Sequence, residues 1–293
     1  MSEIVRPRRS ALYVPGANSR ALEKSTGLAA DMIILDLEDA VAPAEKEASR
    51  TRVCAAIESR AFGPREVLVR VNARGTSWHW DDLRAVAATP AHGVLVPKVD
   101  SPYEAARLAD ALDELDAPQS LRLWVMIETP RAVLAAAEIA ASSDRIEGLV
   151  IGTNDLVNDL GALHVPGRMP VLSSLSHTIL AARASGKAVL DGVYNAVRDT
   201  EGFVAEAAQG RALGFDGKTL VHPAQIGPAN AAFGPSAADV QRAHEVIDAF
   251  SQAEAAGEGV TVVDGQMIEH LHVVHARRVI ALQAQIEALT TAA

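Results

Sequence analysis

Eight short apolar segments, separated by helical patterns, are the feature that most constrains the fold of this chain. Segments without polar alternation are typical of parallel strands that are buried on both faces. Alternation of strand and helix predicts a parallel sheet, and eight repeats predict an α/β fold of the (β/α)₈ TIM barrel type. The predicted strands are Ala11–Val14, Met32–Leu35, Val67–Val71, Gly93–Val96, Leu123–Ile127, Leu149–Ile151, Ala188–Gly192 and Phe215–Thr219.

The segments between these strands have helical periodicity. The predicted helices are Asn18–Ala30, Ala44–Ser59, Asp81–Ala88, Tyr103–Leu115, Arg131–Ala141, Ser174–Ser185 and Thr200–Leu213, with another starting near Ala224. A doubly wound open sheet is the alternative fold. It usually has fewer strands, and no G-x-G-x-x-G follows the first strand here.

The last 61 residues lie outside the eight repeats. A Phe233-Gly-Pro-Ser break separates them, so we predict a catalytic barrel over residues 1–232 and a helical extension over 233–293. The extension has a helical pattern over Ala238–Ala256, a turn-rich break over Gly257–Gly265 and a second helix over Ile268–Leu289. We expect it to form a lid or to contact a neighbouring subunit.

Composition excludes several classes of protein. About half of the 293 residues are hydrophobic, which allows a large core. No run approaches the roughly 20 apolar residues that a membrane span needs, and the N-terminus lacks the apolar core of a signal peptide. A net charge of −10 disfavours nucleic-acid binding. The single cysteine, Cys54, suits a reducing compartment, so we expect a cytoplasmic protein in which this thiol serves packing.

Two acids follow neighbouring predicted strands. Glu128 comes directly after Leu123–Ile127, and Asp155 follows Leu149–Ile151 after a loop of Gly-Thr-Asn. The carboxyl ends of barrel strands face one site. Two carboxylates there repel each other unless a cation lies between them, and oxygen ligands suit Mg²⁺ or Mn²⁺. The alternative is that each acid only caps a helix or a loop.

Other polar residues are also expected at the carboxyl ends of the strands. They are Asp36, Glu38, Asp39, Arg70, Asn72, Lys98, Asp191, Lys218 and His222. Arg70 lies in an apolar strand, so its guanidinium must be paired or must bind a ligand. Its planar fork suits a carboxylate or an enolate oxygen. Pairing with Glu38, Asp36 or Glu128 and ligand binding can hold together.

Three of these residues have simpler interpretations. Asp191 and Lys218 are predicted to be structural ion partners, and His222 is predicted to cap or orient a loop. Lys98 could form a Schiff base, but nearby acids and a cation would keep it charged.

Seven motifs in collinear order resemble the citrate lyase beta-subunit-like branch of the HpcH/HpaI aldolase superfamily. They are Arg9-Ser-Ala-Leu-Tyr-Val-Pro-Gly16, Asp36-Leu-Glu-Asp-Ala-Val41, Arg70-Val-Asn72, Pro97-Lys98, Ile127-Glu-Thr129, Gly152-Thr-Asn-Asp-Leu156 with Leu160-Gly161, and Gly217-Lys-Thr-Leu-Val-His-Pro223. The resemblance covers nearly the whole chain and implies a (β/α)₈ barrel. It also implies trimers or hexamers that cleave or form carbon–carbon bonds in malyl-, citramalyl- or citryl-CoA.

The same resemblance implies roles for individual residues. Glu128 and Asp155 match the Mg²⁺ ligands, and Arg70 matches the arginine that contacts substrate oxygens. Glu38 matches an acid that holds this arginine and the water around the metal. We assign further substrate contacts to the motif residues Gly152, Thr153 and Asn154.

The expected chemistry is retro-Claisen cleavage, in which a metal ion polarises the substrate oxygens and an arginine stabilises the enolate that leaves. The resemblance also implies a catalytic Asp in the C-terminal segment, donated by a neighbouring subunit. The matching stretch, Asp264–His272, has Glu269 at that position, and Asp264 is a lesser candidate. Glu extends the carboxylate by roughly 1.5 Å, and catalytic geometry is sensitive to about 1 Å.

This replacement leaves other functions open. A malyl-CoA-type thioesterase is compatible with the sequence, as is an aldolase that cleaves 2-oxo acids without CoA. A third alternative is a non-catalytic homologue that keeps the metal site. A lone beta-type subunit of a citrate lyase would need an acyl-carrier partner.

Overall fold

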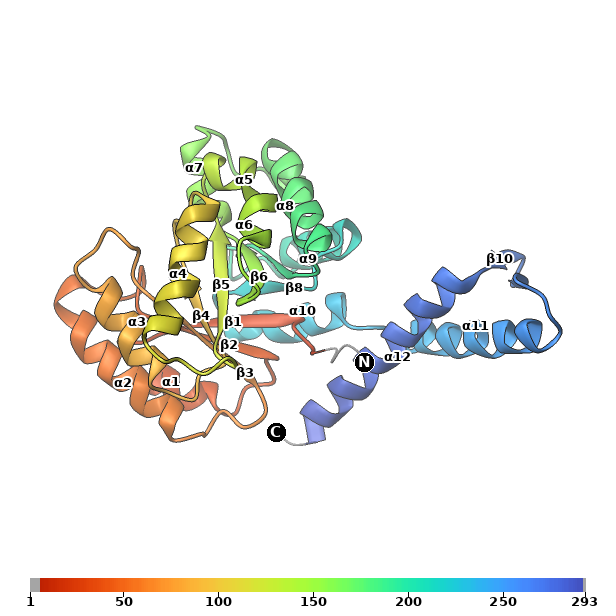
Figure 1. Cartoon of the computed structure of the whole chain (residues 1–293), viewed down its shortest axis with the longest axis horizontal. Helices are drawn as coiled ribbons and strands as arrows, with labels where there is room; N and C mark the ends of the chain where they lie inside the picture. Colours follow the sequence, from red (N-terminus) through yellow and green to blue (C-terminus); the bar gives the residue numbers. More distant parts are fainter. Residues whose placement is uncertain (1–5, 292–293) are drawn as a thin grey trace. The chain divides into compact units, whose positions relative to one another are not determined.

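The computed structural model describes residues 6–291, which fall into two compact units (Figure 1). One unit comprises Arg8–Ala232, and the other comprises residues 233–291 together with residues 6 and 7. The first unit is a closed barrel of parallel strands in the order of the sequence, which confirms the predicted fold. Its strands are β1 (Ser10–Pro15), β2 (Met32–Asp36), β3 (Glu66–Arg70), β4 (Gly93–Val96), β5 (Arg122–Ile127), β6 (Ile146–Ile151), β7 (Ala188–Asp191) and β8 (Gly217–Leu220).

Helices follow every strand of the barrel, close to the predicted positions. They are α1 (Ser19–Ser25), η1 (Pro43–Glu45), α2 (Lys46–Glu58), α3 (His79–Ala87), α4 (Pro102–Glu114), α5 (Pro130–Leu134), α6 (Ala136–Ala141), α7 (Thr153–Asp159), η2 (Pro166–Val171), α8 (Leu172–Ala184), α9 (Thr200–Leu213), η3 (Pro223–Gln225) and α10 (Ile226–Phe233). Asn18 and Ser101 cap α1 and α4 through their side chains, as such residues favour. Cys54 lies within α2 and is half-buried.

Two local predictions in the barrel were wrong. The single helix over Arg131–Ala141 is divided into α5 and α6, because Ala135 leaves helical geometry with φ −101° and ψ 10°. The loop expected to carry Asp155 is instead the start of α7, and Asp155 lies in the first turn of that helix. Gly, Thr, Asn and Asp are typical of loops, but Asn and Asp are also accepted in the first turn of a helix.

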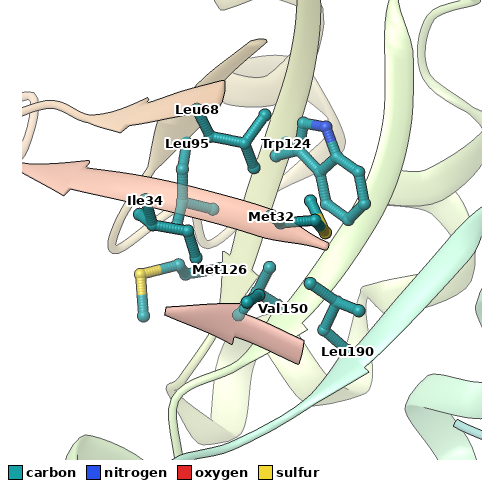
Figure 2. Close-up of a cluster of buried hydrophobic side chains, with 9 residues drawn as sticks. Met32, Ile34, Leu68, Leu95, Trp124, Met126, Val150 and Leu190 are labelled. Carbon is teal, nitrogen blue, oxygen red and sulfur yellow. The ribbon is translucent and has the colours of Figure 1, made fainter. Parts of the chain in front are cut away.

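Side chains from alternate positions of the strands fill the barrel interior. The interior cluster comprises Ala11, Met32, Ile34, Leu68, Leu95, Trp124, Met126, Val150 and Leu190, and Figure 2 shows most of them converging between the strands. Trp124 is fully buried. A Cβ on Gly93 or Gly148 would lie 2.9 Å or 2.4 Å from its indole ring, so these glycines make room for the ring. The barrel is therefore filled below its carboxyl-end face.

The second unit consists of two helices and a β-hairpin, of which the hairpin was not predicted. Its elements are α11 (Ala237–Ala255), β9 (Thr261–Val263), β10 (Gln266–Ile268) and α12 (His270–Thr291). The antiparallel strands turn at Asp264 and Gly265, whose φ values are 50° and 76°. An Asp-Gly pair is a strong hairpin signal, and it lay in the segment that we interpreted as a break. Among the described residues, no helix combines the length and the apolarity that a membrane crossing demands.

Candidate metal and substrate site

The alternation of side chains along the strands brings Asp36, Arg70 and Glu128 to the carboxyl-end mouth of the barrel. On each strand, the residue two positions earlier belongs to the interior cluster. The residue four positions earlier also belongs to this cluster or is the register partner of one of its members. Since side chains alternate along a strand, these three residues point inward as well. Asp36 is also the register partner of Arg70. The sequence spacing and the barrel pairing together form one polar layer above the apolar interior.

Arg70 is held by acids on three sides. Its Nε and Nη2 atoms each donate to a different oxygen of Asp36 at 2.7 Å. Its Nη1 atom lies 3.0 Å from Glu38 Oε2 and 3.4 Å from Asp39 Oδ2. The expected pairing of Arg70 with Asp36 and Glu38 is therefore present. The bidentate contact fixes the plane of the guanidinium and leaves Nη1 on the side of Glu38.

Glu128 is a buried carboxylate among other acids. It is 1% exposed, and its Oε1 accepts a hydrogen bond from the backbone N–H of Lys98 at 2.7 Å. Burial, followed by the charges of Glu38 and Asp155, raises the pKa of Glu128 to about 8. An ionised Glu128 is thus unfavourable in this surrounding unless a positive charge joins it.

The donor set fits a hard divalent cation. Asp155 is half-buried in the first turn of α7, and its charge acts on Glu128. Within residues 6–291 no group of three or more His, Cys, Asp or Glu side chains is arranged to hold a metal ion. Mg²⁺ commonly binds through one or two carboxylates and completes its shell with water and ligand oxygens. Glu128 and Asp155 match that pattern, whereas the described residues do not form a closed site of the zinc type.

Lys98 stays a charged residue at the rim of this site. Burial alone would lower the pKa of its ammonium group, but the charges of Glu38, Asp155 and Glu128 raise it above the usual value. A Schiff-base lysine must lose its proton to attack a carbonyl. The surrounding acids therefore oppose that role for Lys98, as the sequence indicated.

Gly152 is required by the close approach of β6 to Glu128. A Cβ at this position would lie 2.4 Å from the Cβ of Glu128 and 2.5 Å from its Oε2. Replacing Gly152 by Ala should displace the Glu128 carboxylate, and we expect metal-dependent turnover to fall by roughly 100-fold because 1 Å errors are costly. Steady-state kinetics at saturating Mg²⁺ measures this effect. The substitution Gly227→Ala in α10, where a Cβ meets nothing within 4 Å, is the matched control.

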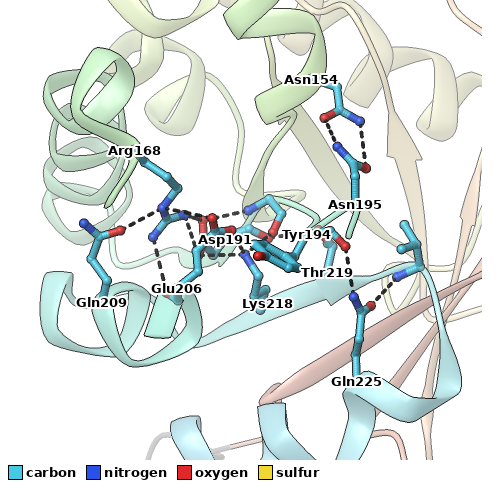
Figure 3. A network of polar contacts seen from close by, with 12 residues as sticks. Asn154, Arg168, Asp191, Tyr194, Asn195, Glu206, Gln209, Lys218, Thr219 and Gln225 are labelled. Carbon is cyan, nitrogen blue, oxygen red and sulfur yellow. Dashed lines mark hydrogen bonds and ion pairs between the residues drawn. The ribbon is translucent and has the colours of Figure 1, made fainter. Parts of the chain in front are cut away.

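Thr153 and Asn154, two of the predicted substrate contacts, differ in their surroundings. Thr153 is buried, and its Oγ1 has no hydrogen-bond partner among the described residues. It lines a cavity of about 470 Å³ formed by α7, the segment around η2, the loop after β7, and α9. Asn154 is exposed and exchanges side-chain hydrogen bonds with Asn195 at 2.7 Å and 3.4 Å (Figure 3). The pair joins the first turn of α7 to the loop that follows β7.

Asp191 and Lys218 form a buried ion network outside the barrel wall. They are register partners on β7 and β8, next to Leu190, which faces the interior. Lys218 Nζ lies 3.1 Å from Asp191 Oδ2 and 2.8 Å from Glu206 Oε1, and Arg168 Nη1 donates to Asp191 at 2.6 Å (Figure 3). They are structural ion partners as predicted, but their side chains point toward η2 and α9, not into the mouth.

Arg168 is a member of this network that the sequence did not reveal. It is 7% exposed, has a left-handed φ of 55°, and binds Asp191, Gln209 and Glu206. Its partners are more than twenty residues away in the sequence, and a lone Arg in a segment of Val, Pro, Gly and Met gives no signal of such pairing. It fixes η2 to the outside of the barrel.

The remaining candidates lie at the edge of the barrel or in the second unit. His222 caps η3, since its Nδ1 accepts from the N–H of Ala224 at 3.2 Å, as predicted. Glu269 lies between β10 and α12, and its backbone N–H donates to His272 Nδ1 at 3.0 Å. Asp264 is ion-paired with Arg242 at the hairpin turn.

Comparisons with known proteins agree with this architecture. Residues 9–223 match the HpcH/HpaI aldolase/citrate lyase family. The chain is 47% identical to a (3S)-malyl-CoA thioesterase of Cereibacter sphaeroides over 98% of this chain and 99% of that protein. It is 35% identical to the citrate lyase subunit beta of Leuconostoc mesenteroides subsp. cremoris, covering 94% of this chain and 93% of that one.

A solved structure shows the same likeness. The protein CitE from Mycobacterium tuberculosis, in complex with magnesium, acetoacetate and coenzyme A, has a TM-score of 0.74 and 31% identity. The match covers 94% of this chain and 97% of that one. By sequence and by fold, this chain belongs to the HpcH/HpaI aldolase/citrate lyase family.

Proposed function

We propose that this protein is a divalent-metal-dependent enzyme that hydrolyses a 3-hydroxyacyl-CoA thioester of the malyl-CoA type. The observation that carries this proposal is the pair of acids, Glu128 and Asp155, beside a guanidinium fixed at the barrel mouth. The full-length similarity to a (3S)-malyl-CoA thioesterase favours hydrolysis over the carbon–carbon cleavage that the sequence motifs first suggested.

Glu128 and Asp155 would hold the cation, Mg²⁺ or Mn²⁺, through their carboxylate oxygens. When bound, the cation supplies Lewis-acid polarisation of substrate oxygens and lowers the pKa of a bound water. The CitE complex contains magnesium together with acetoacetate and coenzyme A, which supports the same class of ligand for this site.

Arg70 and Glu38 would act on the substrate directly. The guanidinium is held in one plane by Asp36, so Nη1, which Glu38 and Asp39 also contact, would present a donor of fixed orientation to a carboxylate or a carbonyl oxygen. Burial raises the pKa of Glu38 to about 7, with Arg70 opposing and Asp39 and Asp36 adding to the shift. A carboxylate with this pKa can exchange a proton near neutral pH.

Hydrolysis then needs one water molecule. Its oxygen bonds to the thioester carbon, the carbon–sulfur bond breaks, and the sulfur leaves as coenzyme A. Glu38 would take a proton from the water and return it to the departing sulfur. The products are the free hydroxy-acid and the thiol.

Carbon–carbon cleavage is the second candidate function. The 35% identical citrate lyase subunit beta favours it. This reaction would release acetyl-CoA and glyoxylate from malyl-CoA, with no water consumed.

We further propose that the protein assembles as a homotrimer or hexamer, which a sedimentation measurement of molar mass would test.

The two reactions can be separated in one assay. The purified full-length protein is incubated with malyl-, citramalyl- and citryl-CoA, with Mg²⁺ or with EDTA. Free coenzyme A with the intact hydroxy-acid indicates hydrolysis, whereas acetyl-CoA with an oxo-acid indicates a lyase. Turnover of a hydroxy-oxo-diacid alone would instead indicate a CoA-independent aldolase. If none of these compounds reacts in the presence of the metal, the proposed function is wrong and a non-catalytic homologue remains.

The role of Glu269 can be tested in the same assay. Because this carboxylate is longer than the expected Asp by roughly 1.5 Å, we expect hydrolysis by the Glu269→Gln variant to stay within about threefold of the parent. Any acetyl-CoA release should fall by about tenfold or more. Glu258→Gln, an exposed position in the same unit, is the control. A large loss of hydrolysis would return Glu269 to the mechanism.

A further inference from the structure

Tyr13 lies on the inner side of β1, next to the candidate site. Ala11, two residues earlier, belongs to the interior cluster, and Tyr13 packs against the same cluster. Its register partner on β2 is Ile34, which also faces the interior. The Cζ atom of Arg70 lies 4.9 Å from the centre of the Tyr13 ring. The ring therefore supports the guanidinium by a cation–π contact and belongs to the wall of the mouth.

A phenylalanine would supply this packing and this cation–π contact equally well. What a tyrosine adds is a hydroxyl, and no hydrogen bond joins the Tyr13 hydroxyl to another residue within 6–291. Since this oxygen is not one of the buried side-chain atoms without a partner among the described residues, it is not fully enclosed. It is an accessible donor on a half-buried side chain, and a ligand in the mouth could use it.

The other two tyrosines differ in this respect. The Tyr194 hydroxyl donates to Asp199 at 2.5 Å, and Tyr103 lies 72% exposed on α4. Burial raises the pKa of Tyr13 above its usual value, Arg70 opposes the shift, and the charges of Asp36, Glu128 and Glu38 add to it. The hydroxyl thus keeps its proton at neutral pH and can donate a hydrogen bond. Those four charges also place Tyr13 within the electrostatic field of the site.

We propose that the Tyr13 hydroxyl donates a hydrogen bond to an oxygen of the short hydroxy- or oxo-acid group bound between Arg70 and the Glu128–Asp155 pair. The ligand class rests on the proposed function, whereas the identity and the position of the donor follow from the place of Tyr13 on the inner side of β1. Asp36 and Glu38 both engage Arg70, so the guanidinium alone offers the ligand few free N–H groups. Tyr13 would supply a donor from the neighbouring strand.

The test is a titration calorimetry experiment on the full-length protein with oxaloacetate in the presence of Mg²⁺. The Tyr13→Phe variant removes one oxygen atom and keeps the ring. We expect its oxaloacetate Kd to rise by roughly tenfold, as for the loss of one hydrogen bond to a charged acceptor. The affinity for Mg²⁺ alone should not change, since the hydroxyl is not a metal ligand. Tyr103→Phe is the matched control and should bind as the parent does.

The outcomes separate this proposal from the proposed function. A parent protein that binds oxaloacetate but turns over no thioester, with binding weakened in Tyr13→Phe, would overturn the function and keep the role of Tyr13. An unchanged oxaloacetate Kd in Tyr13→Phe, or a parent that binds no oxaloacetate, would overturn the role of Tyr13. Equal weakening of Mg²⁺ and oxaloacetate binding would also overturn it, because it would show that the ring only supports the site.

Discussion

Replacing Glu128 by Gln is expected to reduce metal-dependent turnover by roughly 1000-fold or more, because a neutral amide would replace one of the two charged ligands that we propose for the metal. The substitution is nearly isosteric, and Gln can still accept the hydrogen bond from the N–H of Lys98. Added Mg²⁺ should restore little activity. The measurement is kcat and KM for malyl-CoA as a function of Mg²⁺ concentration. Glu138→Gln, the same change at an exposed position on α6, should have parental kinetics.

In the metal-free protein, the same Glu128→Gln substitution should increase stability. The pKa of Glu128 is raised from 4.5 to about 8, so the folded state binds a proton that the unfolded state has released between these values. The free energy of unfolding of the parent therefore falls as the pH rises from about 4.5 to about 8. Glu128→Gln removes this loss and should melt at a higher temperature than the parent in EDTA at pH 8. A lower melting temperature there would contradict the buried, repelled carboxylate.

Replacing Arg70 by Lys is expected to impair both function and stability. Lysine keeps the charge but cannot donate to both oxygens of Asp36 while also reaching Glu38. We expect kcat/KM to fall by roughly 100-fold, in the range found when one fixed donor to a developing charge is removed. The free energy of unfolding should fall by about 3 kcal/mol, because Asp36 is left buried and incompletely paired.

A second buried arginine separates the two effects. Arg145 is 4% exposed and binds Asp113 and three backbone carbonyls. It lies just before β6, at the opposite end of the strands from Glu128. Arg145→Lys should lower the free energy of unfolding by a similar amount while leaving kcat/KM near the parental value. If Arg70→Lys behaves like Arg145→Lys, Arg70 is only a structural ion partner.

The barrel could be predicted because its signal is repetitive and local. Eight apolar strands separated by helices have few other arrangements, and their carboxyl ends meet at one face. The hairpin of β9 and β10 was missed, since each strand has only three residues and periodicity needs a longer window. The first turn of α7 was missed because Thr153, Asn154 and Asp155 suit a loop equally well.

The sequence indicated which residues lie near the mouth, but it could not show which way their side chains point. Asp36 and Asp191 both end strands of four or five residues, yet Asp36 points inward to Arg70 and Asp191 points outward to Arg168. A strand buried on both faces has no polar alternation, so its inward face cannot be read from the residue pattern. Long-range partners such as Arg168 are equally hidden.

The packing around Trp124 leaves the candidate site accessible only from the carboxyl-end mouth of the barrel. Its indole, for which Gly93 and Gly148 leave room, blocks passage through the barrel. A molecule bound at Glu128 would therefore lie in a space that is closed on its inner side. In the proposed hydrolysis, substrate and water would enter, and the products would leave, through this one opening.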